Sequence, residues 1–426
     1  MKRIIPAVLA LVLCAFLSSC SSTSPFVSET VMDEELELSK KLEIYGGVEV
    51  GVNLPDMYFR GEDWMHEMEA LLEEAEDYIL LSTFLGSSCP SLEPIFQILE
   101  RKVEEGVRVY FIIDGISTLD MTDSRYFMTN LIYLKDKGVN LFIYSPLSFT
   151  HLINPAHLLV RDHRKMMVVD GKIAAIGGMN INYISMGSGE KNQRDSMYVF
   201  RSASISSLFI DEFIRIWNEG CVDTMDSEDF KRYEDDNKEY KAWLFNRNVY
   251  SNSASISGMY ASLIEEAKES IFLCPYLPTV DGNMKSSLKR AVDRGVDVEV
   301  WCSQDSRGYA KAGSAWAVAN LIGDTGVEFH DVTYSPNGGI LPMFHMKVMV
   351  VDNRYVVVGS SNFNYRSMTL SHEIGLVIDS PEMAEEVKRE VLSVAGEGII
   401  LDEDTALANK RKYGSFLAYI FSYYGG

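Results

Sequence analysis

The sequence predicts an α/β protein built from two homologous halves. Apolar runs of strand length alternate with amphipathic helical segments, so strand–helix–strand units with parallel strands are expected. The second half then repeats the first: LIEEAKESIFLCPYL corresponds to LLEEAEDYILLSTFL, and LKRAVDRGVDVEVWC to LERKVEEGVRVYFII. We therefore expect the halves to pack about a pseudo-two-fold axis, like an isologous dimer fused into one chain.

One octapeptide marks the same place in each half. It runs from His163 to Asp170 (HRKMMVVD) and, 182 residues later, from His345 to Asp352 (HMKVMVVD). A His and a Lys two residues apart in a strand point to the same face. The apolar run predicts a buried strand, and Asp170-Gly171 predicts a tight turn into a second strand. Each copy is therefore expected to be a β-hairpin that presents an imidazole beside an ammonium, and the axis brings both copies to one cleft.

The other elements of the first half follow from periodicity. Residues 65–72 keep a helical period and precede a strand over 78–84. A helix ended by Gly106 precedes another buried strand, and a helix around TNLIYLKDKGV leads to the strand NLFIYS. After the first hairpin, RDSMYVF predicts a strand and SISSLFIDEFIRIWNEG predicts a helix with one apolar face.

Composition and the repeat together predict the domain organisation. A signal peptide and a Ser/Thr-rich, then acidic, tether that ends in a marginal helix precede the two halves, a charged connector separates them, and an aromatic segment follows. That last segment is expected to be a packing helix, with an interfacial segment near a membrane as the alternative. The predicted boundaries are 1–19 (signal peptide), 20–46 (tether), 47–223 (first half), 224–241 (connector), 242–400 (second half) and 401–426 (aromatic segment).

The N-terminus predicts an exported, lipid-anchored protein. Lys2 and Arg3 precede an apolar stretch that is too short to span a bilayer, and Leu-Ser-Ser-Cys ends at Cys20. This resembles a bacterial lipobox, with cleavage before Cys20 and a diacylglyceryl group on its sulfur. The alternative is an ordinary signal peptide with an incidental cysteine. We expect a lipoprotein on the extracytoplasmic side of a bacterial membrane, with inner and outer membrane both open.

The charge of the chain restricts its partners. The net charge is −22, and removal of residues 1–19 takes away two basic residues and no acidic one, which makes it −24. A wide acidic field disfavours nucleic acid, because Lys and Arg must neutralise its phosphates. The remaining cysteines show no metal-like spacing, and their disulfide state stays open: Cys89, Cys221, Cys274 and Cys302.

The two octapeptides have the form H-x-K-x4-D, and each is followed by an asparagine, Asn180 or Asn362. In this the chain resembles the phospholipase D superfamily, and RDHRKMMVVDGKIAAIGGMNI is most similar to its cardiolipin synthase and phospholipase D-like branch. The resemblance covers roughly residues 47–400. It implies two α/β/α halves with mixed sheets, helices on both faces, and one shared active site that needs no metal and no cofactor.

Residue chemistry supports this reaction class. A phosphodiester is anionic, so its site needs cations and neutral donors at the non-bridging oxygens. Lys165 and Lys347 supply the ammonium groups, and Asn180 and Asn362 supply the amides. Two histidines and two lysines would make a poor zinc site.

The two imidazoles would divide the chemistry. One attacks phosphorus to form a covalent intermediate, and the other, protonated, gives its proton to the leaving alkoxide. Following the usual order in the family, we assign His163 as the nucleophile and His345 as the general acid/base. The resemblance also implies a carboxylate that orients each ring: Asp195 would pair with His163, and Glu373 with His345.

The Asp that ends each octapeptide belongs to the family's catalytic motif, but its place at a hairpin turn favours a structural role for Asp170 and Asp352. Ser361 and Ser367 are expected to contact phosphate or to brace the second hairpin. The other histidines, His372 among them, have no counterpart in the opposite half and are expected to be structural.

A lipid anchor would hold the catalytic domain against a bilayer, which favours a phospholipid substrate. The first hypothesis is phosphatidyl transfer to an alcohol, as in cardiolipin synthesis from phosphatidylglycerol. Hydrolysis to phosphatidic acid is the alternative, because water can take the place of the alcohol. A nuclease shares the motif but is disfavoured by charge, and a non-catalytic lipoprotein is disfavoured because both His–Lys pairs are intact. With both halves in one chain, we expect a monomer.

Overall fold

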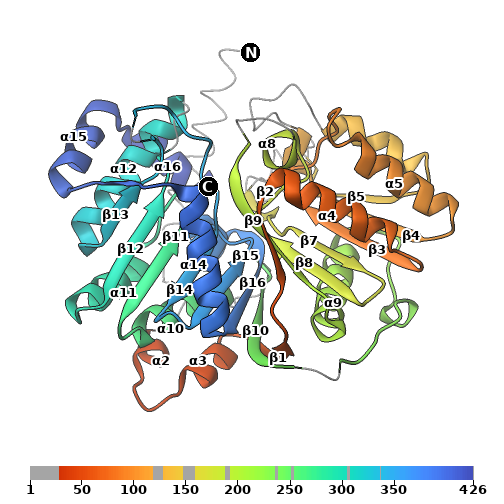
Figure 1. Ribbon diagram of the computed structural model, residues 1–426, viewed down its shortest axis with the longest axis horizontal. Helices are drawn as coiled ribbons and strands as arrows, with labels where there is room; N and C mark the ends of the chain where they lie inside the picture. The colour runs from red at the N-terminus through yellow and green to blue at the C-terminus, as the bar shows by residue number, and fades with distance from the viewer. Residues whose placement is uncertain are drawn as a thin grey trace.

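The computed structural model describes residues 28–118, 128–146, 159–187, 192–235, 238–250, 254–304, 308–335 and 337–425. These residues form two α/β units that lie side by side, each with a mixed β-sheet between helices (Figure 1). The predicted fold class is therefore confirmed. The predicted signal peptide and Cys20 lie outside the described residues.

The sheet of the first half has seven strands in the order β2-β9-β8-β7-β3-β4-β5. β3, β4 and β5 are parallel, as the strand–helix–strand units require, and the other pairs are antiparallel. The strands are β2 (Asp56–Arg60), β3 (Tyr78–Thr83), β4 (Arg108–Asp114), β5 (Asn140–Tyr144), β7 (Met166–Val169), β8 (Ile173–Gly177) and β9 (Arg194–Phe200).

Helices cover both faces of this sheet. Successive side chains of a strand point to opposite faces, so Ile79 packs with α4 (Gly61–Glu73) and α5 (Glu93–Glu104), while Leu80 packs with α9 (Ala203–Gly220). The helix expected around TNLIYLKDKGV is a 3-10 helix, η2. The shorter elements are η1 (Gly115–Thr118), η2 (Met128–Lys135), α8 (Tyr183–Met186) and η3 (Ser227–Asp229).

The second half repeats this design with a ten-stranded sheet. Its strands have the order β1-β10-β16-β15-β14-β11-β12-β13-β17, and β6 also pairs with β16. The strands are β1 (Val48–Val52), β6 (Arg161–Asp162), β10 (Tyr240–Arg247), β11 (Ser270–Cys274), β12 (Asp297–Cys302), β13 (Glu328–Asp331), β14 (Val348–Val351), β15 (Tyr355–Gly359), β16 (Ser371–Asp379) and β17 (Ile399–Ile400).

One continuous core joins the halves. α10 (Ser255–Glu266), α11 (Gly282–Asp293) and α12 (Gly308–Thr325) cover the outer face of the second sheet. α14 (Pro381–Ala395) covers the inner face, and its apolar side chains share a core with those of α9 and of both sheets. The two halves are therefore packed directly against each other.

The N-terminal boundary of the first half differs from the expectation. Residues 48–52 form β1, which pairs with β10 in the sheet of the second half. α2 (Ser28–Met32) and α3 (Leu38–Ile44), in the segment expected to be a tether, pack against α10. Leu42 and Tyr45 are buried there. Removing these apolar side chains from water stabilises the docked segment relative to a free tether. β1 also covers the edge that β10 would otherwise expose.

The C-terminal segment is helical. α15 (Glu403–Tyr413) and α16 (Phe416–Gly425) both pack against α12. Tyr423 of α16 stacks on Tyr365 of α13 (Tyr365–Thr369), with ring centroids 4.4 Å apart. Among the described residues, no helix combines the length and the apolar character needed to cross a membrane.

Candidate active site

Both octapeptides form the expected hairpins. β7 and β8 pair with Met166 opposite Ile176, and β14 and β15 pair in the same way in the second half. Asp170 and Gly171 have φ angles of 51° and 64°, so the tight turn uses left-handed backbone, which glycine adopts without strain. All residues of β7 and β14 are buried. Each strand therefore fixes the imidazole and the ammonium that precede it.

The Asp at the end of each octapeptide is structural. The Asp170 carboxylate accepts backbone N–H groups of Glu76, Asp77 and Tyr78 at 2.8–2.9 Å. Asp352 accepts those of residues 268–270 at 2.8–3.1 Å. Each carboxylate anchors the start of the neighbouring antiparallel strand, β3 or β11, roughly 16 Å along the chain from the Lys at 3.3 Å per residue. These contacts occupy the carboxylate oxygens at the far end of the strand, which supports the structural role expected from the hairpin turn over the catalytic one that the motif implies.

The His163 ring is held by a carboxylate from the other half. Its Nδ1 lies 3.1 Å from Glu373 Oε1 and 3.2 Å from Oε2. Glu373 is fully buried and also accepts a hydrogen bond from Ser360 Oγ at 2.5 Å. Burial raises the pKa of this carboxyl, but His163 and Lys165 lower it by more than burial raises it, so the group is ionised. A carboxylate only accepts, so His163 Nδ1 carries the proton and Nε2 is left with a free lone pair.

The His345 ring is held in the same way from the opposite direction. Its Nδ1 lies 2.6 Å from Asp195 Oδ2, and Asp195 comes from β9 of the first half. Burial raises the pKa of Asp195, but Lys347 and His345 lower it by more than burial raises it, so this carboxyl is also ionised. Each ring thus has a carboxylate on Nδ1, and at His345 the Lys347 Nζ also lies 2.8 Å from the same nitrogen.

The carboxylates are exchanged between the halves, which corrects the predicted pairing. Asp195 orients His345, not His163, and Glu373 orients His163, not His345. The backbone explains the exchange. The His163 N–H donates to the carbonyl of His372 at 3.0 Å, and the His345 N–H donates to the carbonyl of Arg194 at 2.8 Å. The residue before each carboxylate therefore bridges to the other half, and the next side chain points at the other half's histidine.

The two ammonium groups share one buried site. Lys165 Nζ donates to the carbonyl of His163, and Lys347 Nζ to that of His345, each at 2.5 Å. Burial lowers the pKa of Lys165 to about 7 and that of Lys347 to about 8. Lys347 contributes to the lowered pKa of Lys165, so the two cations repel each other across the site. An anion bound between them would relieve this repulsion.

Burial also lowers the imidazole pKa values, to about 4 for His163 and about 3 for His345. Each lysine also lowers the pKa of the histidine in the opposite half, so the charges of the two motifs act on each other across one site. Both rings are therefore neutral near pH 7. A neutral imidazole can act as a nucleophile or as a base, and a bound phosphate anion raises its tendency to accept a proton.

A comparison with known families matches the cardiolipin synthase, phospholipase D-like domain over residues 68–217 and 260–394, which is more than half of the chain. The chain belongs to the phospholipase D superfamily. The two matched segments correspond to the two halves of the fold, and each contains one of the octapeptides.

Curated relatives include a probable cardiolipin synthase of Bacillus subtilis, 23% identical over 336 residues, and a cardiolipin synthase of Clostridium perfringens, 26% identical over 333 residues. Each match covers 76% of this chain, and 62% and 66% of those relatives. An uncharacterized protein of Streptococcus mutans is 28% identical over 343 residues, covering 78% of this chain and 69% of that protein. The chain thus spans about two thirds of the length of these relatives.

A solved phosphatidylserine synthase of Haemophilus influenzae has the same fold. It superposes with a TM-score of 0.69 at 13% identity, and the match covers 91% of this chain and 97% of that one.

The asparagines of this phospholipase D-type site lie where each hairpin ends. Asn180 is buried, and its Oδ1 accepts the N–H of Leu85 at 3.0 Å, which leaves its NH2 group as a donor. Among the described residues, Asn362 Oδ1 and Ser361 Oγ are buried without a hydrogen-bond partner. Ser367 Oγ accepts the N–H of Asn362 at 3.1 Å and therefore braces the loop.

Two aromatic rings complete the site and were missed in the sequence. The Phe84 ring lies 4.7 Å from the His163 ring and 5.1 Å from Lys165 Nζ. Tyr276 lies 4.6 Å from the His345 ring and 5.8 Å from Lys347 Nζ. The two rings occupy matching positions in LLSTFL and FLCPYL, so the repeat itself carried the signal.

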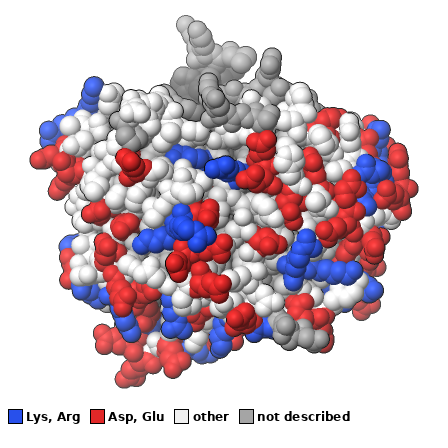
Figure 2. All heavy atoms as spheres, in the orientation of Figure 1, with Lys and Arg blue, Asp and Glu red and all other residues white. Residues whose placement is uncertain are grey.

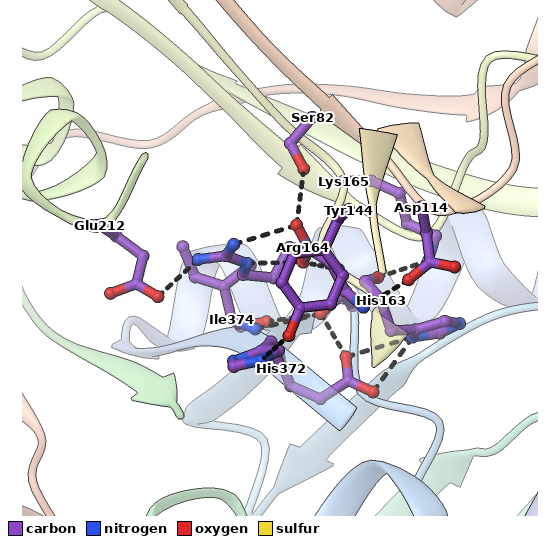
Figure 3. A network of polar contacts seen from close by, with 12 residues as sticks. Ser82, Asp114, Tyr144, His163, Arg164, Lys165, Glu212, His372 and Ile374 are labelled. Atoms are coloured by element: carbon purple, nitrogen blue, oxygen red, sulfur yellow. Dashed lines mark hydrogen bonds and ion pairs between the residues drawn. The ribbon is translucent and has the colours of Figure 1, made fainter. Parts of the chain in front are cut away.

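A buried polar network braces the backbone on both sides of His163 (Figure 3). The Arg164 guanidinium donates to Asp162 at 2.8 and 3.0 Å and to Glu212 at 2.5 Å. The His372 ring bonds to the Tyr144 hydroxyl at 2.8 Å. The His372 backbone supports His163, so the structural role expected for this histidine is a positioning one. The sequence offered one signal for this network: Glu212 lies on the buried face of the α9 helix, and a buried acid needs a cation as its partner.

No cluster of His, Cys, Asp and Glu suited to a metal ion occurs in the described part of the chain. Within the described residues no disulfide involves Cys89, Cys221, Cys274 or Cys302, and all but Cys221 are buried.

Proposed function

We propose that the protein is a phosphatidyltransferase that acts on phospholipid phosphodiesters, with transfer between two phosphatidylglycerol molecules to give cardiolipin as its reaction. The observation that carries the proposal is the pair of exchanged His–carboxylate contacts, His163–Glu373 and His345–Asp195, beside two buried lysines. The names of the curated relatives favour this reaction over others of the superfamily.

In the first step, Nε2 of His163 attacks phosphorus and the bond to the leaving alkoxide breaks. His345 must hold a proton on Nε2 at this point, and it transfers that proton to the alkoxide oxygen. In the second step, His345 takes the proton of the incoming hydroxyl, whose oxygen attacks phosphorus and breaks the P–N bond. Lys165 and Lys347 stabilise the charge on the non-bridging oxygens in both transition states.

In both rings a carboxylate engages Nδ1 and leaves Nε2 to face a bound phosphate, which supports a nucleophile and an acid in one site, while the assignment of the two roles follows the family order. Glu373 engages Nδ1 of His163, so Nε2 is the nitrogen available for attack. The imidazolium that forms at phosphorus is stabilised by the same carboxylate. The low pKa of free His345 is compatible with an acid role because a phosphodiester adds negative charge beside the ring.

The test is incubation of the purified protein with phosphatidylglycerol vesicles, followed by mass identification of the lipid products. Cardiolipin and glycerol together support the proposal, phosphatidic acid indicates hydrolysis, and unchanged lipid refutes both. His163→Ala is expected to abolish turnover, whereas His66→Ala, whose side chain is 66% exposed on α4, serves as the matched control. Undiminished turnover in His163→Ala would contradict the mechanism.

We also propose that a lipid on Cys20 holds the enzyme at the extracytoplasmic face of a bacterial membrane as a monomer. The basic start, the short apolar stretch and the Leu-Ser-Ser-Cys sequence support this location. Cys20→Ser is expected to release the protein from membranes and to remove the mass of a diacylglyceryl group from the N-terminal peptide. An unmodified Cys20 in the membrane fraction would contradict the anchor.

A further inference from the structure

One exposed corner of the fold combines apolar and basic side chains. It lies where α15 ends and α16 begins, and Phe416, Leu417 and Tyr413 are 60%, 45% and 40% exposed. We define this α15–α16 corner by its residues Lys410, Arg411, Lys412, Tyr413, Phe416 and Leu417.

Packing of α16 accounts for one face of the helix only. Ala418 and Ser422 are buried against α12, and the approach is so close that a Cβ on Gly313 would lie 2.3 Å from Ser422 Oγ. Trp316 of α12 meets the Phe416 ring at 5.4 Å, yet most of Phe416 remains in solvent. The sequence left two readings for this aromatic segment, a packing helix or an interfacial one. The structure satisfies the first through the face that packs on α12, and it leaves Phe416 and Leu417 at the start of the helix exposed.

Charge distinguishes this corner from the rest of the molecule. The chain has 39 basic and 61 acidic residues, and acidic side chains are spread widely over the face shown in Figure 2. α15 nevertheless carries three successive cations in its last turn, while its acidic residues Glu403 and Asp404 lie in its first turn. The Tyr413 ring lies between two ammonium groups, with Lys311 Nζ at 4.4 Å and Lys412 Nζ at 4.8 Å from its centroid.

Exposed Phe and Leu beside Tyr and Lys/Arg are the composition that favours a membrane interface. Apolar side chains enter the acyl boundary, tyrosines lie at the headgroups, and cations meet anionic phosphates. Water-soluble partners do not require this combination, and the acidic surface elsewhere repels an anionic bilayer. The composition of the corner is therefore complementary to such a bilayer.

The corner is coupled to the active site by direct packing. α16 stacks on α13 through Tyr423 and Tyr365, and the Arg366 guanidinium donates to a carbonyl near the end of α16. α13 starts three residues after Asn362 of the site. The Tyr365 N–H donates to the carbonyl of Thr279 at 2.9 Å, which fixes α13 against the loop after β11. The helix that begins in the corner thus packs against the elements that frame the site at its other end, about 10 Å along the helix at 1.5 Å per residue.

We propose that the α15–α16 corner docks on anionic phospholipid bilayers and so sets the orientation of the catalytic domain on the membrane. The choice of phospholipid as occupant rests on the proposed function, whereas the docking itself does not require turnover. Two signals, the expected N-terminal lipid and this corner, would hold the domain at two points and restrict its rotation.

Docking can be measured with an environment-sensitive fluorophore on one cysteine in the full chain. The background carries Cys14→Ser, Cys20→Ser, Cys221→Ser and His163→Ala, which removes the two N-terminal thiols with the lipid, the half-exposed thiol and the catalysis. The probe is placed by Leu417→Cys in the corner or by Val222→Cys, a 97% exposed control site in the first half. Vesicles contain phosphatidylglycerol and phosphatidylcholine with brominated acyl chains as quencher, or phosphatidylcholine alone.

Quenching of the probe at 417, several-fold stronger than at 222 and dependent on phosphatidylglycerol, is expected. The double variant Arg411→Gln with Lys412→Gln is expected to weaken the 417 signal about 30-fold in apparent affinity, at roughly fivefold per cation. The matched pair Lys388→Gln with Arg389→Gln on α14 is expected to leave the signal unchanged.

Equal quenching at 222 and 417, or none at 417, would overturn the proposal. So would a probe at 417 that is shielded without vesicles in a protein that sediments as a dimer, because the occupant would then be a second copy. Because the background is inactive, success here together with failure of the turnover assay would separate docking from the proposed reaction.

Discussion

The exchange of carboxylates between the halves makes a prediction that a conventional alanine scan would miss. In Glu373→Gln, the amide oxygen can accept from Ser360 Oγ or from His163 Nδ1, but the charge that stabilises the His163 imidazolium is lost. A hydrogen bond to a charged group contributes about 1.5–3 kcal/mol, so attack by His163 is expected to slow about 10- to 150-fold.

The assay compares two substrates that differ in their need for a proton. Phosphatidylglycerol releases an alkoxide, which requires the general acid, whereas a p-nitrophenyl phosphodiester releases a stable phenolate, which does not. With the first substrate, variants of both imidazole–carboxylate pairs are expected to be slow. With the second, the burst of nitrophenolate is expected to survive in His345→Ala and Asp195→Asn and to be lost or slowed in His163→Ala and Glu373→Gln.

The grouping of variants decides the matter. If Asp195→Asn behaves like His163→Ala and Glu373→Gln behaves like His345→Ala, the pairing is within each half and our reasoning is refuted. If His345→Ala and Asp195→Asn together lose the burst, the exchange holds but the nucleophile is His345. Near-UV circular dichroism of each variant controls for loss of fold.

Three further predictions concern stability and pH. Asp170→Asn retains at most two of three backbone hydrogen bonds, so urea unfolding is expected to show a free energy of unfolding lower by about 2–4 kcal/mol. The kcat of the folded enzyme is expected to be unchanged, and a matching loss in kcat would indicate a catalytic role for Asp170. Arg194 is half-buried and donates to four backbone carbonyls of the second half at 2.7–3.1 Å, so Arg194→Met is expected to cost about 3 kcal/mol. The control Arg389→Met, whose side chain is 62% exposed, is expected to cost about 0.5 kcal/mol or less. Burial brings the pKa values of Lys165 and Lys347 to about 7 and 8, so each ammonium is partly deprotonated near pH 8. Binding of a phosphate anion therefore takes up protons at pH 8, and the affinity for phosphate is expected to fall as the pH rises to 9. Calorimetric binding enthalpies that are the same in buffers of different ionisation enthalpy would contradict this proton uptake.

Much of the fold was predictable because its signals are local or repeated. The strand predicted from RDSMYVF coincides with β9, and the Asp-Gly turn after β7 has the expected left-handed backbone. The duplicated octapeptide located the site because the same residues in two contexts are hard to explain by chance. The role of Asp170 at a turn followed from its position at the end of an apolar run.

What the sequence could not show was the partner of each side chain across the interface. Spacing places Asp195 and Glu373 at the starts of their strands, but pairing depends on which half each strand end faces. The same limit applies to β1, whose residues precede the first half in the chain and yet extend the sheet of the second. Both are long-range choices, made by edge pairing and burial after the local elements exist.

The exchange also explains why the two halves act as one unit. Each half supplies a histidine and a lysine from its own hairpin, but the carboxylate that sets the tautomer of that histidine comes from the other half. A separated half would therefore present an imidazole without its orienting group and a buried carboxylate without its partner, and a buried unpaired charge is strongly destabilising. Symmetry ends behind the rings: His163 is backed by His372 and the Arg164 network, and His345 by Arg194 with its carbonyl acceptors. The inner contacts differ too, because Lys347 Nζ lies 2.8 Å from His345 Nδ1. Two imidazoles with similar carboxylates and different surroundings can hold their protons differently once a phosphate is bound, which is what a nucleophile and an acid in one site require.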